Sequence, residues 1–353
     1  MQPQIGKTIE IDGHHLDLEQ FIAVARFGAQ IRIADRAIER MARSRKAVED
    51  IVESGRPAYG INTGFGDFSR VSISRDDANT LQNNLILSHC TGMGEAYPAE
   101  TVRGMLLLRA NALCGGYSGI RPEIVLTMAD MLNLNVHPVV PQKGSLGASG
   151  DLAPLSHLAL VLLGLGEADF QGERLPGAEA MKRAKLPTYS LRAKEGLALI
   201  NGTDGILGML CLALHDLSEL ARLADVTAAL TVEGLLGTDR AFAADLQALR
   251  PQLGQAVSAR NLTRLLAGSA IVASHREGDR RVQDPYSLRC TPQVHGAALD
   301  TIAHARMIAE RELQAAIDNP MILPDGRVES CGNFHGAPVA FVCDFLRIAI
   351  SEL

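Results

Sequence analysis

The run Gly144-Ser-Leu-Gly-Ala-Ser-Gly-Asp-Leu-Ala-Pro-Leu-Ser-His157 is the stretch around which this chain is organised. Its glycines at positions 144, 147 and 150 surround Ala148 and Ser149. Glycine has no Cβ to clash, so this spacing favours a backbone that folds back tightly on itself. We therefore predict a forced turn around Ala148 and Ser149.

Held in such a turn, the tripeptide Ala148-Ser149-Gly150 can react with itself. The amide nitrogen of Gly150 attacks the carbonyl carbon of Ala148 and closes a five-membered ring. Loss of water from the ring and of the hydroxyl of Ser149 leaves an exocyclic methylene conjugated to a carbonyl. This group is a strong electrophile, which no unmodified side chain provides. The structural alternative is a loop or N-cap serine ahead of a helix near Leu155.

The run from Gly144 to His157 resembles the signature of the aromatic amino acid lyases, and the resemblance extends from about Ala58 to the last residue. That family uses the self-made prosthetic group 4-methylidene-imidazol-5-one (MIO). The resemblance implies an MIO formed from Ala148, Ser149 and Gly150, and elimination of ammonia from an aromatic amino acid.

Hydrophobic periodicity predicts a mainly α fold, in which long buried helices form a central bundle beside a loop-rich N-terminal active-site region. We expect residues 1–200 to form the N-terminal region and residues 201–353 the bundle. Residues 1–13 are expected to be a strand pair or irregular, 16–55 two helices broken near Gly28, 170–187 a hairpin, and 318–336 a loop or short strand. Further helices are predicted over 76–90, 101–113, 122–134, 155–165, 195–200, 206–236, 246–266, 292–316 and 338–353.

Composition limits the possible partners and location. The net charge of −6 argues against nucleic acid, which usually binds a basic surface. No basic-then-apolar leader and no 18-residue uncharged apolar run were found, so we expect a cytoplasmic protein. The six scattered cysteines predict reduced thiols, and the histidines lack metal-ligand spacing, so no metal is expected. The last predicted helix has no stop signal, and family members continue beyond it, so we expect the chain to be truncated at its C-terminus.

Tyr59 lies in a loop of the form Tyr-Gly-x-x-Thr-Gly-Phe-Gly, filled here by residues 59–66. A glycine-rich loop that carries a phenol is suited to an active-site lid, and Phe68 follows it. A tyrosine elsewhere would more often be a core aromatic with a solvated hydroxyl. The resemblance makes Tyr59 the candidate general base.

Gln283, Tyr286 and Arg289 belong to the segment Gln283-Asp-Pro-Tyr-Ser-Leu-Arg289. In isolation the segment would be a helix-start turn with a surface arginine. An arginine fork is also the natural bidentate clamp for a substrate carboxylate. The resemblance gives Arg289 that role, Tyr286 a catalytic role and Gln283 a place in the pocket.

Asn201 and Asn333 would by default be turn asparagines. The resemblance implies that Asn201 orients the prosthetic ring and the substrate, and that Asn333 and Phe334 line the same pocket.

Ser88-His89 occupies the position that selects the substrate side chain in the family, and histidine-specific members carry Ser-His there. His89, otherwise a structural helix-end histidine, is therefore expected to contact an imidazole, and His335 indicates the same specificity. Asp204 departs from that pattern, which has glutamine after Asn-Gly-Thr. The implied reaction is conversion of L-histidine to trans-urocanate and ammonia.

Three alternatives remain open. The chain is a lyase for tyrosine or another aromatic amino acid, an aminomutase that re-adds the ammonia, or an inactive helical scaffold. The resemblance also implies a homotetramer whose pockets combine residues of three subunits. It implies as well a glutamate for the imidazole from beyond residue 353.

Overall fold

A computed structural model describes residues 8–64, 73 and 75–353. The predicted mainly α architecture is confirmed: long helices dominate, and the sheets have only two or three strands in the described residues. The chain divides into two compact units, the first formed by Met1–Leu212 with Ala309–Pro338 and the second by Ala213–Ile308 with Val339–Leu353. The boundary expected after residue 200 thus falls inside the first unit, to which residues 309–338 also return.

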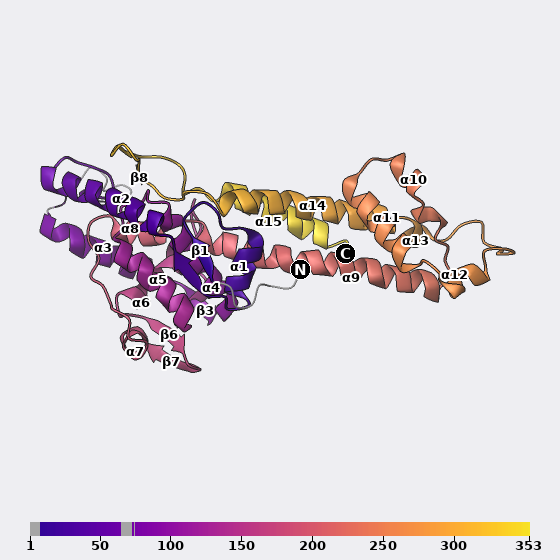
Figure 1. The fold of residues 1–353 in the computed structure, drawn as a ribbon, viewed down its shortest axis with the longest axis horizontal. Coiled ribbons are helices and arrows are strands. Elements are labelled where there is room, and N and C mark those ends of the chain that lie inside the picture. Colours follow the sequence, from indigo (N-terminus) through magenta and orange to yellow (C-terminus); the bar gives the residue numbers. More distant parts are fainter. Residues whose placement is uncertain (1–7, 65–72, 74) are drawn as a thin grey trace. The chain divides into compact units, whose positions relative to one another are not determined.

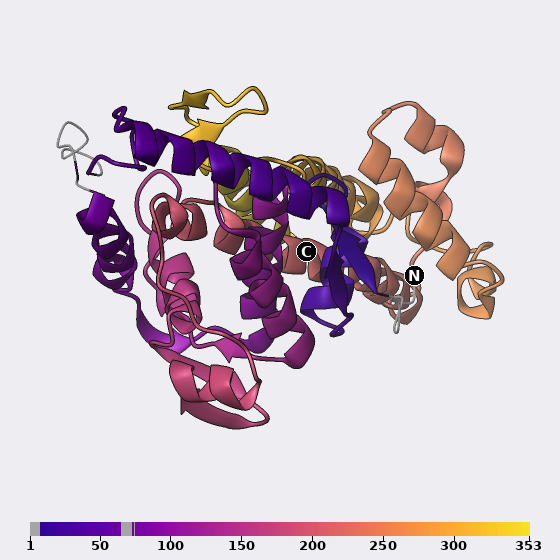
Figure 2. The ribbon, with the colours of Figure 1, turned by 60° about the vertical axis from the view of Figure 1, so that its left-hand side comes forward.

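Helix α4 (Ala99–Cys114) is the centre of the first unit. Its Met105, Leu106 and Leu107 are fully buried, and α1, α2 and α5 all contact it. Figure 2 shows the long α2 lying across α4 and α5. The other helices of this unit that precede α9 are α1 (Leu18–Ala25), α2 (Asp35–Ser54), α3 (Arg75–His89), α5 (Pro122–Leu134), α6 (Leu152–Leu162), α7 (Gly177–Arg183) and α8 (Glu195–Ile200).

Short strands tie the loops of the first unit together. β1 (Ile9–Ile11) pairs in parallel with β2 (Ile31–Ile33). The prediction of two helices over 16–55 is therefore wrong at residues 31–33, because Ile31 and Ile33 bury alternate side chains of a strand. The remaining pairs are antiparallel: β3 (Met93–Ala96) with β5 (Pro141–Lys143), β6 (Glu167–Phe170) with both β4 (His137–Pro138) and β7 (Glu173–Pro176), and β8 (Met321–Ile322) with β9 (Val328–Glu329).

The second unit is built on the C-terminal part of α9 (Asp204–Gly234) and most of α14 (Thr291–Glu312). Figure 1 shows α10, α11, α12 and α13 gathered around the end of α9. A small apolar core that includes Val232, Phe242 and Leu262 joins α9, α11, α12 and α13. The other elements are η2 (Arg240–Phe242), α12 (Ala270–Ser274), α13 (Tyr286–Arg289) and α15 (Ala337–Ile350).

The single helix predicted over 246–266 is two helices, α10 (Ala244–Ala248) and α11 (Leu253–Leu265). Pro251 lies between them, and proline disfavours helical backbone at the residue before it. The prediction is wrong because apolar periodicity continues across this break.

One helical stretch of the described residues, Glu195–Gly234, is long and apolar enough to cross a membrane, with a mean hydropathy of 1.7. Within it, 83% of the most apolar window is buried inside the protein. Burial of that kind is typical of the core helix of a helical protein.

Candidate active site

The turn predicted around Ala148 and Ser149 lies between β5 and α6. The backbone N–H of Leu146 donates to the carbonyl of Gly150 at 3.1 Å and closes the turn. Gly147 and Gly150 have φ angles of +80° and +88°, which side chains with a Cβ rarely adopt. A Cβ at residue 150 would also lie 2.6 Å from Cδ1 of Ile206. Both glycines are therefore required by the backbone.

Two segments distant in sequence hold this turn. The N–H of Gly336 donates to the carbonyl of Ala148 at 2.8 Å. The Asp151 carboxylate, directly after the turn, accepts hydrogen bonds from the N–H groups of Gly205 and Ile206, at 2.7 and 2.9 Å. These N–H groups belong to the first turn of α9, where unpaired donors favour an anion. Ser149 itself is buried, with 4% of its surface exposed.

Burial dominates the electrostatics beside the turn. It raises the pKa of Asp151 to about 7, against the opposing effect of the two backbone hydrogen bonds. Arg109 is fully buried, and its Nη1 lies 3.1 Å from Oδ2 of Asp204. The aspartate that departs from the histidine-specific pattern thus compensates a buried arginine.

Asn201 caps the C-terminus of α8 and is 7% exposed. Its Nδ2 donates to Oδ1 of Asp318 and to the carbonyl of Asn319, both at 3.2 Å. Its own carbonyl accepts from Nη1 of Arg109 at 3.2 Å. Residues 201–206 therefore connect two sets of hydrogen bonds: those of Asn201, and those that Gly205 and Ile206 donate to Asp151.

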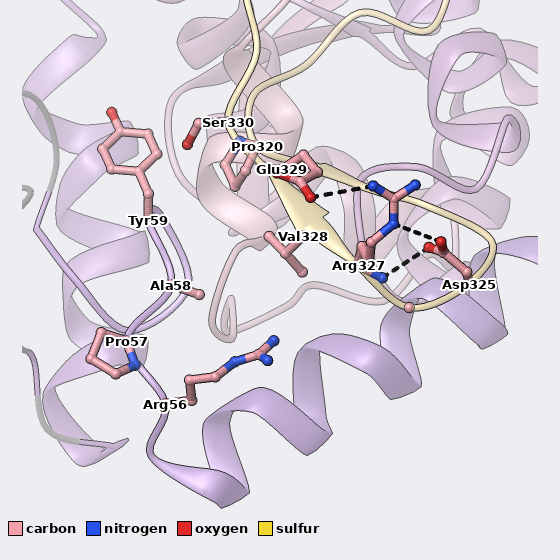
Figure 3. A pocket seen from close by; sticks show the side chains of 11 residues that line it. Arg56, Pro57, Ala58, Tyr59, Pro320, Asp325, Arg327, Val328, Glu329 and Ser330 are labelled. Carbon is pink, nitrogen blue, oxygen red and sulfur yellow. Dashed lines mark hydrogen bonds and ion pairs between the residues drawn. The ribbon is translucent and has the colours of Figure 1, made fainter.

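Tyr59 lies on the wall of a cavity of about 490 Å³. Figure 3 shows Arg56 and Tyr59 on one side of this cavity and the β8–β9 hairpin on the other. Arg327 of the hairpin is paired with Asp325 at 2.6 Å. The described residues that line the cavity come from 56–59 and 320–330, so the structure does not bring Ala148–Gly150 to it. Within the tyrosine motif, Phe65 and Gly66, together with Phe68 after it, lie outside the described residues.

His89 is the last residue of α3 and is half-buried. Its Nδ1 lies 2.9 Å from the carbonyl of Leu85 and 3.0 Å from Oγ of Ser88. Both contacts fix the ring through one nitrogen. Asn333 and Phe334 lie close in sequence to Gly336, whose N–H holds the turn.

Gln283, Tyr286 and Arg289 belong to the second unit. Tyr286 is 73% exposed, and Nε of Arg289 donates to the carbonyl of Asp284 at 2.7 Å. The structure therefore places these three residues together around α13, which starts at Tyr286 and ends at Arg289.

Three buried residues, Arg109, Lys194 and Asp318, were not predicted from the sequence. Arg109 pairs with Asp204, Asp318 accepts from Asn201, and Lys194 pairs with Asp318. Their partners lie far away in the sequence, so no local pattern pointed to them. The one available signal was a lysine directly before an apolar helix, since a buried lysine requires a partner.

A glycine-pinned Ala-Ser-Gly turn beside the N-terminus of a long helix, in a largely helical fold, is an arrangement typical of a carbon–nitrogen lyase. The family model for aromatic amino acid lyases matches residues 16–353, and the chain belongs to that family.

The chain is similar to several named proteins of this family. The chain is 50% identical over 347 residues to the histidine ammonia-lyase of Streptomyces coelicolor, covering 98% of this chain and 68% of that protein. Among solved structures, a histidine ammonia-lyase from Trypanosoma cruzi is 38% identical with a TM-score of 0.87, covering 98% of this chain and 65% of that one. A tyrosine aminomutase from Streptomyces globisporus is 34% identical with a TM-score of 0.90, covering 98% and 69%. The chain thus spans about two thirds of the length of these relatives.

Proposed function

We propose that this chain carries the activity of an ammonia-lyase that converts L-histidine to trans-urocanate and ammonia. The observation that carries the proposal is the identity of about 50%, over nearly the whole chain, to proteins named histidine ammonia-lyase. The Ser88-His89 pair supports the same substrate.

The proposal includes an MIO formed from Ala148, Ser149 and Gly150, and the residues present fit that group. The positive φ angles of Gly147 and Gly150 permit the tight turn, and hydrogen bonds of Gly336 and Asp151 hold it. A Cβ on Gly336 would lie 3.1 Å from the carbonyl oxygen of Ser149, which is a tight contact that glycine avoids. When formed, the MIO supplies an electrophilic methylene carbon that turns the substrate amine into a better leaving group.

Other side chains would bind and orient the substrate and remove its proton. Tyr59 removes the weakly acidic β-proton, and the Arg289 guanidinium holds the carboxylate through paired hydrogen bonds. Tyr286 and Asn201 orient the reacting substrate, and His89 contacts its imidazole.

Three further side chains complete the proposed pocket, which they line: Gln283, Asn333 and Phe334. Their role is to hold the substrate in a reactive orientation and to exclude water.

We also propose that the active form is a cytoplasmic homotetramer, with each pocket drawn from three subunits. Within the second unit, α9 exposes the apolar stripe Leu223, Val226 and Leu230, and α15 exposes Phe341 and Ile348. Exposed apolar stripes favour contact with another protein surface. Convergence of Tyr59 and Ser149 would then occur between chains.

The test combines mass and turnover. Intact mass of the wild-type protein should be lower than the encoded mass by two water molecules, and L-histidine should yield a product with urocanate absorbance. Ser149→Ala should keep its full encoded mass, lack the ultraviolet absorbance of the ring and lose turnover. Retained activity in Ser149→Ala would refute the proposal that Ser149 forms the electrophile.

An aminomutase of the same family is the second candidate, because the solved tyrosine aminomutase shares the fold at 34% identity. A β-amino acid product from histidine or tyrosine would establish that candidate. The third candidate, an inactive scaffold, would show no turnover of histidine or tyrosine, and a wild-type mass without loss of water would establish it.

A further inference from the structure

A fully buried ion pair lies behind Asn201. Nζ of Lys194 is 2.6 Å from Oδ2 of Asp318, and both side chains are 0% exposed. Removing two charges from water is costly, and an apolar pair of the same volume is often at least as stable. Lys194 also has a φ of +72°, which is unfavourable for a residue with a Cβ. An ion pair that is present despite the cost of burying two charges and the cost of a positive φ is a candidate for a functional role.

The Asp318 carboxylate is shared between this lysine and Asn201. While Oδ2 accepts from Lys194, Oδ1 accepts from Nδ2 of Asn201 at 3.2 Å and from the N–H of Asn319 at 2.7 Å. The second amide hydrogen of Asn201 is directed to the carbonyl of Asn319. Both donors of the amide are therefore engaged, and its two ends are no longer interchangeable.

We propose that Lys194 and Asp318 are positioning residues that fix the side-chain amide of Asn201. Lys194 holds the carboxylate of Asp318, the carboxylate takes Nδ2 of Asn201, and Oδ1 of Asn201 is thereby directed away from Asp318. Among the described residues, that oxygen has no hydrogen-bond donor, so it is available to the substrate. This inference rests on the proposed function, in which Asn201 orients the reacting substrate.

Positioning and simple charge compensation make different predictions for two neutral double variants. Lys194→Met with Asp318→Leu removes both charges and leaves no acceptor for Asn201. Lys194→Met with Asp318→Asn also removes both charges, but the amide oxygen at residue 318 can still accept from Nδ2. Neither variant leaves an unpaired buried charge, so both are expected to fold.

We expect the Leu-containing double variant to lose kcat by about tenfold to hundredfold with a smaller change in KM, as for a misplaced reactive group. The Asn-containing variant should stay within about threefold of wild type, since the hydrogen bond to Asn201 is retained. Turnover is divided by the fraction of chains whose mass shows the loss of two waters. A lower kcat then reflects the position of Asn201 and not incomplete ring formation. Equal kcat values in the two double variants would overturn the proposal.

A structural readout decides the question even if wild type fails to act on histidine. Crystal structures should show the Asn201 side chain displaced in the Leu-containing variant and in its wild-type place in the Asn-containing one. Unchanged Asn201 contacts in both would contradict positioning, whereas absent turnover in wild type would contradict only the proposed function.

Glu195→Gln is the matched control. Glu195 is as buried as Asp318 and is paired with Arg121 at 2.6 Å, without a hydrogen bond to Asn201 in the described residues. We expect this variant to lose stability and keep its kcat. A loss of kcat equal to that of the Leu-containing variant would mean that any buried charge nearby matters, and would overturn the specific role of Asp318.

Discussion

Asp151 shows at the scale of one residue how the turn and the helix behind it are joined. Its carboxyl group is buried and receives two N–H groups from the start of α9. Burial still dominates and raises its pKa to about 7, so the folded protein binds a proton here that the unfolded chain releases at much lower pH.

The first prediction follows from that difference. Stability from Asp151 is fully present below its unfolded pKa of about 4 and is lost as the pH rises through about 7. Between about pH 5 and about pH 8 we expect wild type to lose about 2.5 kcal/mol more unfolding free energy than Asp151→Asn. Urea unfolding at both pH values measures this, with the exposed Asp245→Asn as control. Parallel pH profiles for wild type and Asp151→Asn would contradict it.

Individual residues differ in how well the sequence predicts them. The glycines at 147 and 150 were predicted because their conformational role is local, and the structure gives both a positive φ. The partners of Asn201 were not, because Asp318 lies more than a hundred residues away and only tertiary packing brings it near. Local patterns thus predicted the turn but not the contacts that hold its neighbours.

At the scale of elements, the helices with local start and stop signals were predicted best. α5 begins at Pro122, which is favourable in the first turn, and ends before Asn135 in the left-handed conformation. α12 and α13 were missed, because helices of five and four residues are too short to show a period.

The second prediction concerns α1, which begins with a capping box. The side chain of Asp17 accepts from the N–H of Gln20 at 2.7 Å, and the Gln20 side chain accepts from the N–H of Asp17 at 3.1 Å. Asp17→Ala should lower the unfolding free energy by about 1 kcal/mol. Asp35→Ala is the control: Asp35 is in the first turn of α2, whose N-cap Ala34 makes no side-chain cap. Equal losses in chemical denaturation would show that the cap contributes nothing specific.

At the scale of the whole molecule, the chain leaves the first unit at Leu212 and returns to it from Ala309 to Pro338. That return places Asp318 and Gly336 against Asn201 and Ala148. The mainly α class was predictable from periodicity. The return was not, because a loop gives no sequence signal for the surface on which it packs.

The third prediction concerns assembly. Leu223 and Leu230 are 57% and 63% exposed on α9. Replacing both with glutamate places charges on the apolar stripe, and we expect the proposed tetramer to dissociate into smaller species. Mass in solution measures this. Leu134→Glu, a similarly exposed leucine on α5, is the control and should leave assembly intact. A tetramer that survives the double substitution would rule out this stripe as a contact.

The hydrogen bond from Gly336 to Ala148 also sets an order of events during biosynthesis. Residue 336 is translated long after Ser149, so the Ala-Ser-Gly segment waits without this hydrogen bond while nearly two hundred further residues are added. The folded geometry of this turn is therefore reached late, and a nascent chain halted before residue 336 carries the Ala-Ser-Gly segment without that support.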